Sequence, residues 1–363
     1  MASIPESIQQ SETVAKIFAT YEATERQESP RQYLGASAIG QKCARAIWYG
    51  FRACGLEKFE GRMLRLFETG HREEPRMVAN LRAAGCEVHD RDEAGNQFGI
   101  SAIAGHFKGH ADGVALGIHE APKTWHLLEF KTHSAKSYKA LESKGVKESK
   151  PQHYAQMQVY MRHMGIDRAF YLAQNKDTDE LYAERINHDE LASAQIMQRA
   201  ASIIGTNEAP ERINSDPDSW DCRYCHHKTL CHGHEPSAPA VPATVHCRNC
   251  IHATPEMDGD GRWSCAKHGS TLTPADQIKT CPHHLFLPTL LTFATPVDGG
   301  EVDGVTWIEY QREDGRKFRM SKHANDYTSA ELTNLPAALV GLGTVDEVKN
   351  IFGAVAEAVE CEH

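Results

Sequence analysis

The chain has 363 residues, of which 40% are hydrophobic and 24% charged, so it can bury the core of a globular protein. Its formal net charge of −10 argues against a protein that coats nucleic acid through bulk positive charge. We find neither a basic and apolar leader nor the roughly 18 apolar residues of a membrane span. We therefore expect a cytoplasmic protein with no membrane partner.

The spacing of apolar residues predicts an α/β core. In chain order we expect helices at 5–27, 37–54 and 59–84, strands at 86–89, 97–103, 110–116 and 125–131, helices at 134–143 and 152–165, strands at 168–174 and 181–186, and a helix at 188–205. This order of helices and strands indicates a mixed central sheet flanked by helices.

Composition changes after residue 231 and predicts further segments. Three prolines in a run of Ala and Ser indicate a semi-rigid linker. The last segment is expected to hold a hairpin (305–310 and 316–320) and helices at 329–342 and 345–359. We expect a helical segment at 1–34, a main domain at 35–233, the linker at 234–245, a cysteine-rich module at 246–287 and a small α+β segment of unknown role at 288–363.

Acidic and basic residues at the ends of two expected strands predict a metal-dependent site. Asp112 would lie on one strand, and Glu129 and Lys131 on the next. Strand alternation places Glu129 and Lys131 on one face and Phe130 on the other. Two carboxylates can share a divalent cation that holds a phosphate and activates water, while Lys131 offsets the developing charge. The pattern favours phosphodiester cleavage.

A lysine-rich stretch follows this strand. Residues 123–150 contain seven Lys and three Glu, a local charge of +4. A solvated helix would explain this equally well, but a DNA backbone would approach the site here. The candidate DNA-binding residues are Lys136, Lys139, Lys144, Lys147 and Lys150.

Two further motifs make residues 35 to 235 resemble the PD-(D/E)XK nuclease superfamily, especially its RecB-like branch and the lambda-exonuclease type of phage enzyme. One is Gly-His-Arg-Glu-Glu-Pro at 70–75, and the other is Gln-x-x-x-Tyr at 156–160. The resemblance implies a restriction-endonuclease-like core. It also implies a Mg²⁺ or Mn²⁺ site formed by Glu74, Asp112, Glu129 and the backbone carbonyl of Phe130.

The same resemblance assigns the remaining site residues. Gln156 and Tyr160 would line the site and position DNA. Glu74 stands where RecB-like members commonly have His, and His71 or Glu73 could take its role.

The chain has eleven cysteines and no export signal, which favours metal ligands over disulfides. Cys222, Cys225 and Cys231 can converge on one centre, with Cys43 far upstream. This bracket resembles the iron–sulfur nucleases, AddB and the CRISPR-associated RecB-like exonucleases, and so implies a [4Fe-4S] cluster that closes a long loop. Zinc is the competing interpretation, because Cys-x2-Cys is also a zinc knuckle and several His are near.

A second set consists of Cys247, Cys250, Cys265 and Cys281, whose spacing is typical of a structural zinc ribbon. Ordinary buried thiols are the alternative, and His268 is one of several His that could replace a thiol. Cys54, Cys86 and Cys361 receive no role.

Together these features predict a metal-dependent DNA exonuclease used in recombination, repair or replication, plausibly encoded by a phage or prophage. DNA is the expected partner, and a recombination or single-strand-binding protein is a second candidate. The alternative is a non-catalytic nucleic-acid-binding protein on a nuclease scaffold, which the intact acidic and basic set disfavours. The sequence indicates neither strand polarity nor oligomeric state.

Overall fold

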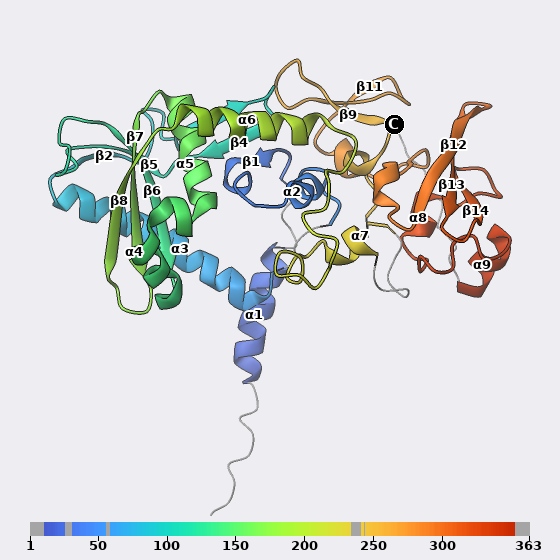
Figure 1. Cartoon of the computed structure of the whole chain (residues 1–363), viewed down its shortest axis with the longest axis horizontal. Helices are drawn as coiled ribbons and strands as arrows, with labels where there is room; N and C mark the ends of the chain where they lie inside the picture. The colour runs from blue at the N-terminus through green and yellow to red at the C-terminus, as the bar shows by residue number, and fades with distance from the viewer. Residues whose placement is uncertain (1–10, 26–30, 56–58, 234–240, 243, 353–363) are drawn as a thin grey trace, which may run out of the picture. The chain divides into compact units, whose positions relative to one another are not determined.

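The structure is a computed structural model that describes residues 11–25, 31–55, 59–233, 241–242 and 244–352. The chain divides into two compact units (Figure 1). Unit 1 comprises 1–31, 57–100 and 109–194, and unit 2 comprises 32–56, 101–108 and 195–363. Within the described residues, no helix has the length and apolar character needed to cross a membrane.

Unit 1 is built on a five-stranded mixed sheet of order β2-β5-β6-β7-β8. The central pair β6 and β7 is parallel and the other neighbours are antiparallel. The strands are β2 (Glu87–His89), β5 (Gly113–Leu116), β6 (His126–His133), β7 (Arg168–Asn175) and β8 (Leu181–Asn187). This confirms the expected mixed α/β core.

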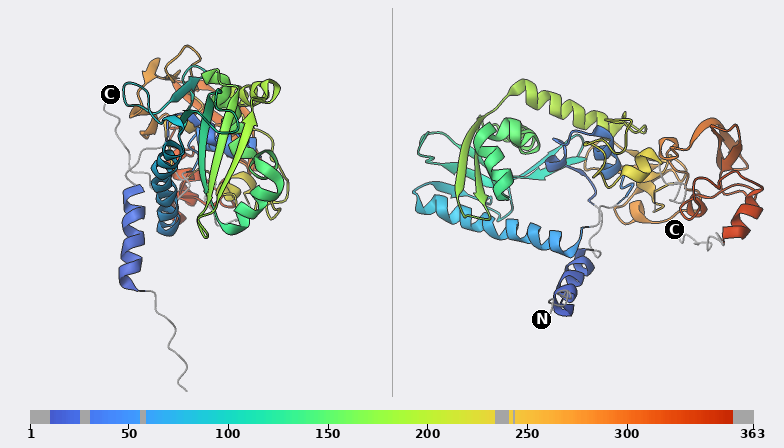
Figure 2. Two further views of the ribbon diagram at one scale, coloured as in Figure 1. Left: turned by 90° about the vertical axis from the view of Figure 1, so that its left-hand side faces the viewer. Right: turned by 60° about the horizontal axis from the view of Figure 1, so that its bottom comes forward.

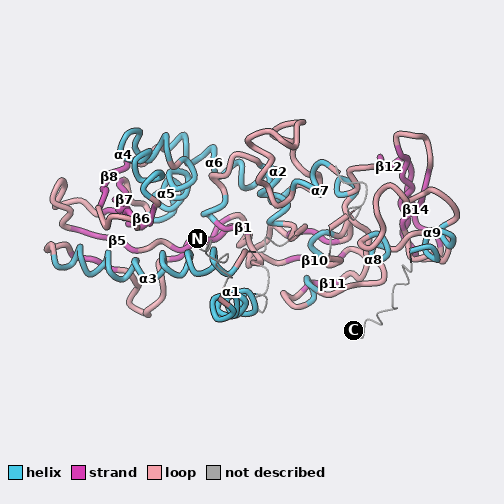
Figure 3. The backbone as a smooth tube through the Cα atoms, turned by 90° about the horizontal axis from the view of Figure 1, so that it is seen from below, coloured by secondary structure: helices cyan, strands magenta, loops and turns pink. Residues whose placement is uncertain are grey.

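Helices cover both faces of this sheet (Figures 2 and 3). They are α3 (Gly61–Ala83) on one face and α4 (Ala135–Ser149) and α5 (Pro151–Met164) on the other. Helix α1 (Glu12–Glu25) packs on α3, and the start of α6 (Glu190–Gly205) also belongs to unit 1. On one face α3 packs Met77 and Leu81 against Leu128, Phe130 and other apolar residues of the sheet. Helices α4 and α5 cover the opposite face, to which Glu129 and Lys131 point.

Apart from β12 and β13 near the end of the chain, most elements of unit 2 are short. Its first part has β1 (Leu34–Gly35), the 3-10 turn η1 (Ala36–Ala38) and α2 (Ala44–Phe51); β3 (Gly99–Ala102) and β4 (Phe107–His110) join it to unit 1 along the chain. The cysteine-rich part has α7 (Lys228–His232), η2 (Cys247–Asn249), β9 (Ala253–Pro255), β10 (Trp263–Cys265), β11 (Ser270–Leu272), η3 (Asp276–Ile278) and η4 (Pro288–Leu290). The end of the chain has β12 (Ala294–Val302), β13 (Val305–Arg312), β14 (Lys317–Met320), α8 (Ser329–Leu332) and α9 (Val345–Phe352).

Two buried arginines join α2 to the cysteine-rich part of unit 2. The rings of Phe51 and Trp263 lie 5.5 Å apart, the Arg52 guanidinium lies 5.2 Å from the Trp263 ring, and that of Arg248 lies 5.4 Å from the Phe51 ring. Arg52 also donates a hydrogen bond of 3.0 Å to the carbonyl of Thr206. These stacked cations and rings form much of the local core.

The expected helix at 37–54 is wrong in its first half, because α2 begins only at Ala44 with Cys43 as its N-cap. The guanidinium of Arg199 donates hydrogen bonds of 2.7 to 3.0 Å to the carbonyls of Ile39, Gln41 and Lys42. Those carbonyls therefore cannot all serve a helical turn.

The expected single strand at 110–116 is also wrong. The chain leaves β4 at His110 and enters β5 at Gly113, so Asp112 lies in a bend between two strands and not on one. Gly113 has φ of +148°, and a Cβ there would approach the His89 carbonyl oxygen to 2.6 Å. Only glycine fits this entry into the sheet.

Helix α4 runs past the expected end at residue 143 and continues to Ser149 across a break at Gly145, whose φ is +69°. The N-terminal helix lies inside its expected range, of which 5–10 and 26–27 fall outside the described residues. The hairpin of β13 and β14 is confirmed, and β12, which pairs with β13, was not expected.

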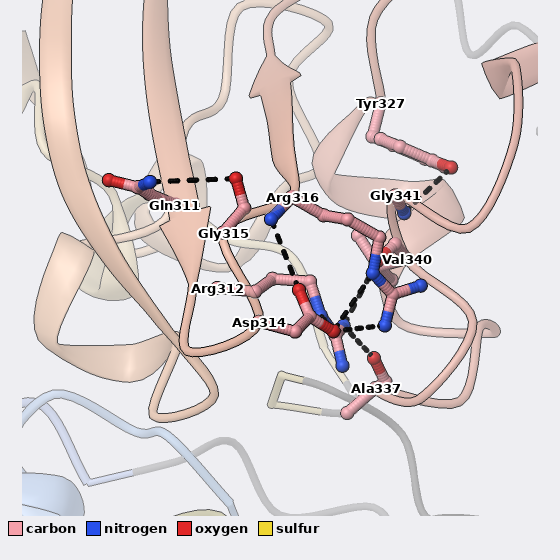
Figure 4. A network of polar contacts seen from close by, with 9 residues as sticks. All are labelled: Gln311, Arg312, Asp314, Gly315, Arg316, Tyr327, Ala337, Val340 and Gly341. Carbon is pink, nitrogen blue, oxygen red and sulfur yellow. Dashed lines mark hydrogen bonds and ion pairs between the residues drawn. The ribbon is translucent and has the colours of Figure 1, made fainter.

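The expected helix at 329–342 is wrong, since α8 ends at Leu332. Pro336 follows closely, and the Arg312 side chain donates hydrogen bonds to the carbonyls of Ala337 and Val340 (Figure 4). The Gly341 N–H donates to the Tyr327 hydroxyl at 3.3 Å. These contacts hold the segment as a loop. The helix expected at 345–359 is described only as far as Phe352.

Candidate active site

Glu129 lies at the centre of unit 1, in the middle of β6, with a side chain that is fully buried. Lys131 is two residues further along the strand and therefore on the same face. Its side chain is 28% exposed, and its ammonium ion-pairs with Glu129 and donates to the Phe130 carbonyl at 3.0 Å. Phe130 points the other way, into the core under α3. The alternation expected from the sequence is thus present.

Asp112 reaches the same place from the bend before β5. Its Oδ2 accepts the backbone N–H of Phe130 at 2.6 Å. Since β5 and β6 are adjacent, the carboxylates of Asp112 and Glu129 flank the same stretch of backbone. A hydrogen bond from a fixed backbone donor orients Asp112 and leaves its other oxygen available.

Glu74 joins these groups from α3, on the other side of the sheet edge. Burial raises the pKa of the Glu74 carboxyl, and the charge of Asp112 raises it further, whereas His71 and Lys131 lower it. Asp112 and Lys131 are therefore close enough to affect the charge of Glu74. Of the two sequence alternatives, Glu73 ion-pairs with Arg76 at 3.1 Å.

Gln156 and Tyr160 lie one turn apart on α5, and both are buried. The Gln156 amide donates to the Tyr160 hydroxyl at 3.5 Å. Burial raises the pKa of Tyr160, and the nearby charge of Glu129 raises it again. Helix α5 therefore packs beside β6 and brings Tyr160 close to Glu129 and Asp112.

The charge of Glu129 is poorly compensated. Burial raises the pKa of its carboxyl to about 7, although the Lys131 ammonium lowers it, and the charges of Asp112 and Glu74 raise it further. Burial opposes the charge of Lys131 as well, but the carboxylates of Glu129 and Asp112 raise its pKa above the usual value. Among the described residues, Glu129 Oε2 has no hydrogen-bond partner.

These donors suit a hard divalent cation. Carboxylate and carbonyl oxygens are the ligands that Mg²⁺ and Mn²⁺ prefer, and a buried carboxylate oxygen without a partner needs a positive charge. In the described part of the chain, no three His, Cys, Asp or Glu side chains are close enough together to hold a metal ion among themselves. The fit therefore rests on the chemistry of the donors and on the Phe130 carbonyl beside them.

A second polar cluster beside the site was not foreseen. The Tyr171 hydroxyl lies 2.8 Å from His133 Nε2 and 2.9 Å from His153 Nδ1, and the three rings are stacked. Burial lowers the pKa of both histidines, which the Lys131 charge lowers further. The sequence signal was available for His133, which shares the strand face of Lys131, but Tyr171 comes from β7.

The lysine track is only partly available for ligands. Lys144 ion-pairs with Glu148 at 2.9 Å, and Lys150 donates to Ser137 at 3.0 Å. Lys147 lies 3.7 Å from Asp189. Lys136 and Lys139 are exposed, three residues apart on α4, and have no carboxylate partner among the described residues.

The sequence profile of the PD-(D/E)XK nuclease superfamily matches residues 8–232, well over half of the chain. The chain belongs to the PD-(D/E)XK nuclease superfamily. The matched range contains Glu129 and the five other candidate side chains, as well as the first cysteine set. No protein with a curated description matches the sequence significantly.

Solved structures of exonucleases are distantly similar to this superfamily member. LHK-Exo, an alkaline exonuclease from Laribacter hongkongensis solved in complex with dAMP, shares 18% identity over 52% of this chain and 90% of its own, with a TM-score of 0.34. A phage-related exonuclease from Haemophilus somnus shares 14% identity over 47% and 91%, with a TM-score of 0.33. Likeness of this size says nothing about activity.

In unit 2 of this superfamily member, the first cysteine set gathers around one small cavity. Cys43, Cys222, Cys225 and Cys231 all line it, together with His227. Burial raises the pKa of the Cys225 thiol, and the other three thiols raise it further. The structure thus brings together four cysteines, of which Cys43 and Cys231 are 188 positions apart in the sequence.

The second cysteine set lines a larger cavity of about 650 Å³. Burial raises the pKa of Cys247 to about 12, and Cys250, Cys265 and Cys281 raise it further. His268 Nε2 lies 3.5 Å from the Cys281 sulfur. None of the ten described cysteines is in a disulfide, but neither set has the geometry of a metal site.

Proposed function

We propose that the chain is a DNA exonuclease that hydrolyses phosphodiester bonds with Mg²⁺ or Mn²⁺, in recombination, repair or replication in a phage or prophage setting. The observation that carries the proposal is the fully buried Glu129 carboxylate, held between Asp112 and Lys131 with one oxygen lacking a partner. A structural ion pair would satisfy both oxygens of a buried carboxylate.

The side chains divide the work of cleavage among them. Glu74, Asp112, Glu129 and the Phe130 carbonyl would hold the cation, which supplies Lewis acidity toward the phosphate and acidifies a water. Lys131 is placed to hold the attacking water and to offset negative charge on the phosphate oxygens. Gln156 and Tyr160 would then orient the strand above the carboxylates.

We further propose that the cysteine sets hold structural metal centres. Cys43, Cys222, Cys225 and Cys231 would carry a [4Fe-4S] cluster, or zinc in its place, and Cys247, Cys250, Cys265 and Cys281 would carry zinc. The support is the gathering of each set around one cavity. Thiolate ligands suit iron–sulfur clusters and zinc, and a bound metal would relieve thiols that burial keeps protonated.

End-labelled linear DNA and closed circular DNA, each with Mg²⁺ or Mn²⁺, test the nuclease proposal. We expect the wild-type chain to degrade the linear form from its ends, to spare the circle, and to lose activity reversibly in EDTA. The Asp112→Ala and Lys131→Ala variants should bind DNA without cleaving it. Cleavage that persists in both variants would refute the proposal and leave the non-catalytic DNA-binding protein as the better hypothesis.

Elemental analysis of anaerobically purified protein tests the cysteine centres. The expected result is iron with a broad visible absorption band, lost in Cys225→Ser, and one zinc, lost in Cys265→Ser. Zinc alone in both sets would replace the cluster by a second zinc site. Neither metal in either set would reduce the cysteines to ordinary thiols.

A further inference from the structure

A cavity of about 360 Å³ opens beside the carboxylate centre within unit 1. We call it the side pocket. Helix α3 contributes Phe67, His71 and Glu74, and the end of β6 and the residue after β7 contribute Lys131 and Lys176. Its size lies at the lower end of the range of about 300 to 1,000 Å³ that small-molecule sites occupy.

Helix α3 contributes an aromatic ring to the side pocket. Residues 67, 70, 71 and 74 recur at helical spacing and share one face of α3. Phe67 is 40% exposed, so its ring is accessible to a ligand in the side pocket. The Phe59 ring meets it edge-on at a centroid distance of 4.9 Å and so fixes its orientation.

The ends of β6 and β7 contribute two lysines to the side pocket. The backbone N–H of Lys176 donates to the His133 carbonyl at 2.9 Å, which fixes the backbone of Lys176 beside the end of β6. Among the described residues, Lys176 has no carboxylate partner, in contrast to Lys144 and Lys228 elsewhere in the chain. Lys131 is the other lysine of the side pocket. An anion is the natural ligand of these lysines.

Gly70 keeps space open in the side pocket. A Cβ at this position would lie 3.8 Å from the Thr132 hydroxyl, in ordinary contact, so no clash requires glycine here. A longer side chain would instead project toward Thr132, which also lines the side pocket. The absence of a side chain therefore preserves volume.

We propose that the side pocket binds one nucleotide of the DNA strand, with its base stacked on Phe67 and its phosphate held by Lys176. An aromatic ring and a cation that line one pocket match the base and the phosphate of a nucleoside monophosphate. Glu74 belongs both to the side pocket and to the proposed metal set, so the bound nucleotide adjoins the bond to be cut. This inference rests on the proposed nuclease function and names a subsite of it.

Binding of 2-aminopurine deoxyriboside 5′-monophosphate to the full chain in Mg²⁺ tests the inference. The probe has no phosphodiester bond to cleave, and its fluorescence falls when its base stacks on a ring. We expect saturable quenching by the wild-type chain and an affinity about tenfold lower in Phe67→Ala, the loss of one base-stacking contact. Phe67→Tyr should restore binding.

The other variants separate the parts of the side pocket. Lys176→Ala should weaken binding and Lys176→Arg should retain it, and Gly70→Leu should block the probe by filling the cavity. Trp125→Ala is the matched control, because Trp125 is also 40% exposed in unit 1. The affinity of a variant is compared with that of the wild-type chain only if both have the same thermal unfolding midpoint.

The outcomes distinguish this inference from the nuclease proposal. If the wild-type chain degrades DNA but Phe67→Ala and Lys176→Ala keep full affinity for the probe, the nucleotide-binding proposal is wrong. The nuclease proposal is then unaffected. Absence of saturable probe binding by a cleaving wild-type chain overturns the nucleotide-binding proposal too. If the chain cleaves no DNA but binds the probe in a way that depends on Phe67, the nucleotide site is supported and the nuclease proposal is contradicted.

Discussion

The carboxylate centre of unit 1 and the cysteine sets of unit 2 differ in how the fold holds them. Glu129 lies in the middle of an eight-residue strand with neighbours on both sides, and Gln156 and Tyr160 lie on a fourteen-residue helix. The thiols lie on a five-residue helix, a 3-10 turn, a three-residue strand and loops.

This difference indicates which role each metal would have. The sheet and helices already hold the carboxylates in place, so the main role of a cation there would be in the chemistry of cleavage. The short elements of unit 2 bury less backbone in regular structure, so a metal there would act as a cross-link that restricts the unfolded chain.

The largest effect is expected from Asp112→Ala, which should lower kcat by about 10³-fold or more because the cation loses a ligand. The unfolding temperature should change little. Cys265→Ser should do the reverse, lowering the unfolding temperature while the folded fraction keeps its activity. Steady-state kinetics and calorimetry on both variants decide; a matched loss of activity and stability in either one contradicts the contrast.

Trp263→Ala should cost about 3 to 5 kcal/mol of folding free energy, since a fully buried indole is removed from between Phe51 and the two arginines. Trp220, 71% exposed in the same unit, is the control, and its alanine variant should stay near wild type. Urea unfolding followed by circular dichroism measures both. Equal losses would mean that the aromatic and arginine packing does not stabilise unit 2.

The pH profile should report the buried Glu129. Its pKa near 7 in the folded chain lies above the ordinary 4.5, so the carboxylate needed for the cation forms only as pH rises through about 7. At low Mg²⁺, kcat/KM should fall about tenfold per pH unit below that point, and higher Mg²⁺ should shift this limb to lower pH. A flat profile between pH 5 and 8 would contradict it.

The same shift affects the stability of the metal-free chain. Because the folded pKa is raised, the stability contributed by the protonated form is complete below pH 4.5 and is lost as pH rises through about 7. Glu129→Gln should therefore raise the unfolding temperature at pH 8 and leave it unchanged at pH 4, when both proteins are measured in EDTA.

The smallest effect is expected from Lys136→Ala with Lys139→Ala. Loss of two phosphate contacts should raise KM for DNA a few-fold and reduce the salt dependence of binding by about 2 in log–log slope. Lys16→Ala, an exposed lysine of α1, is the control. An unchanged salt slope would remove α4 from the DNA path.

The sequence by itself determined the local features of this protein. The alternation that places Glu129 and Lys131 together is a property of any strand, and helical spacing set the bounds of α3 and α5 within a few residues. The cysteine spacing already grouped Cys222 with Cys225. Such features depend on neighbours in the chain, which a reader of the sequence can see.

The tertiary structure decided the features that depend on distant partners. Asp112 lies outside its expected strand because its carboxylate accepts a hydrogen bond from the Phe130 N–H. The turn before α2 forms because Arg199 donates hydrogen bonds to the carbonyls there. The pairing of His133 with Tyr171 likewise needs two strands to meet. Hydrogen bonds between residues far apart in sequence leave no periodic trace, so only the folded chain shows them.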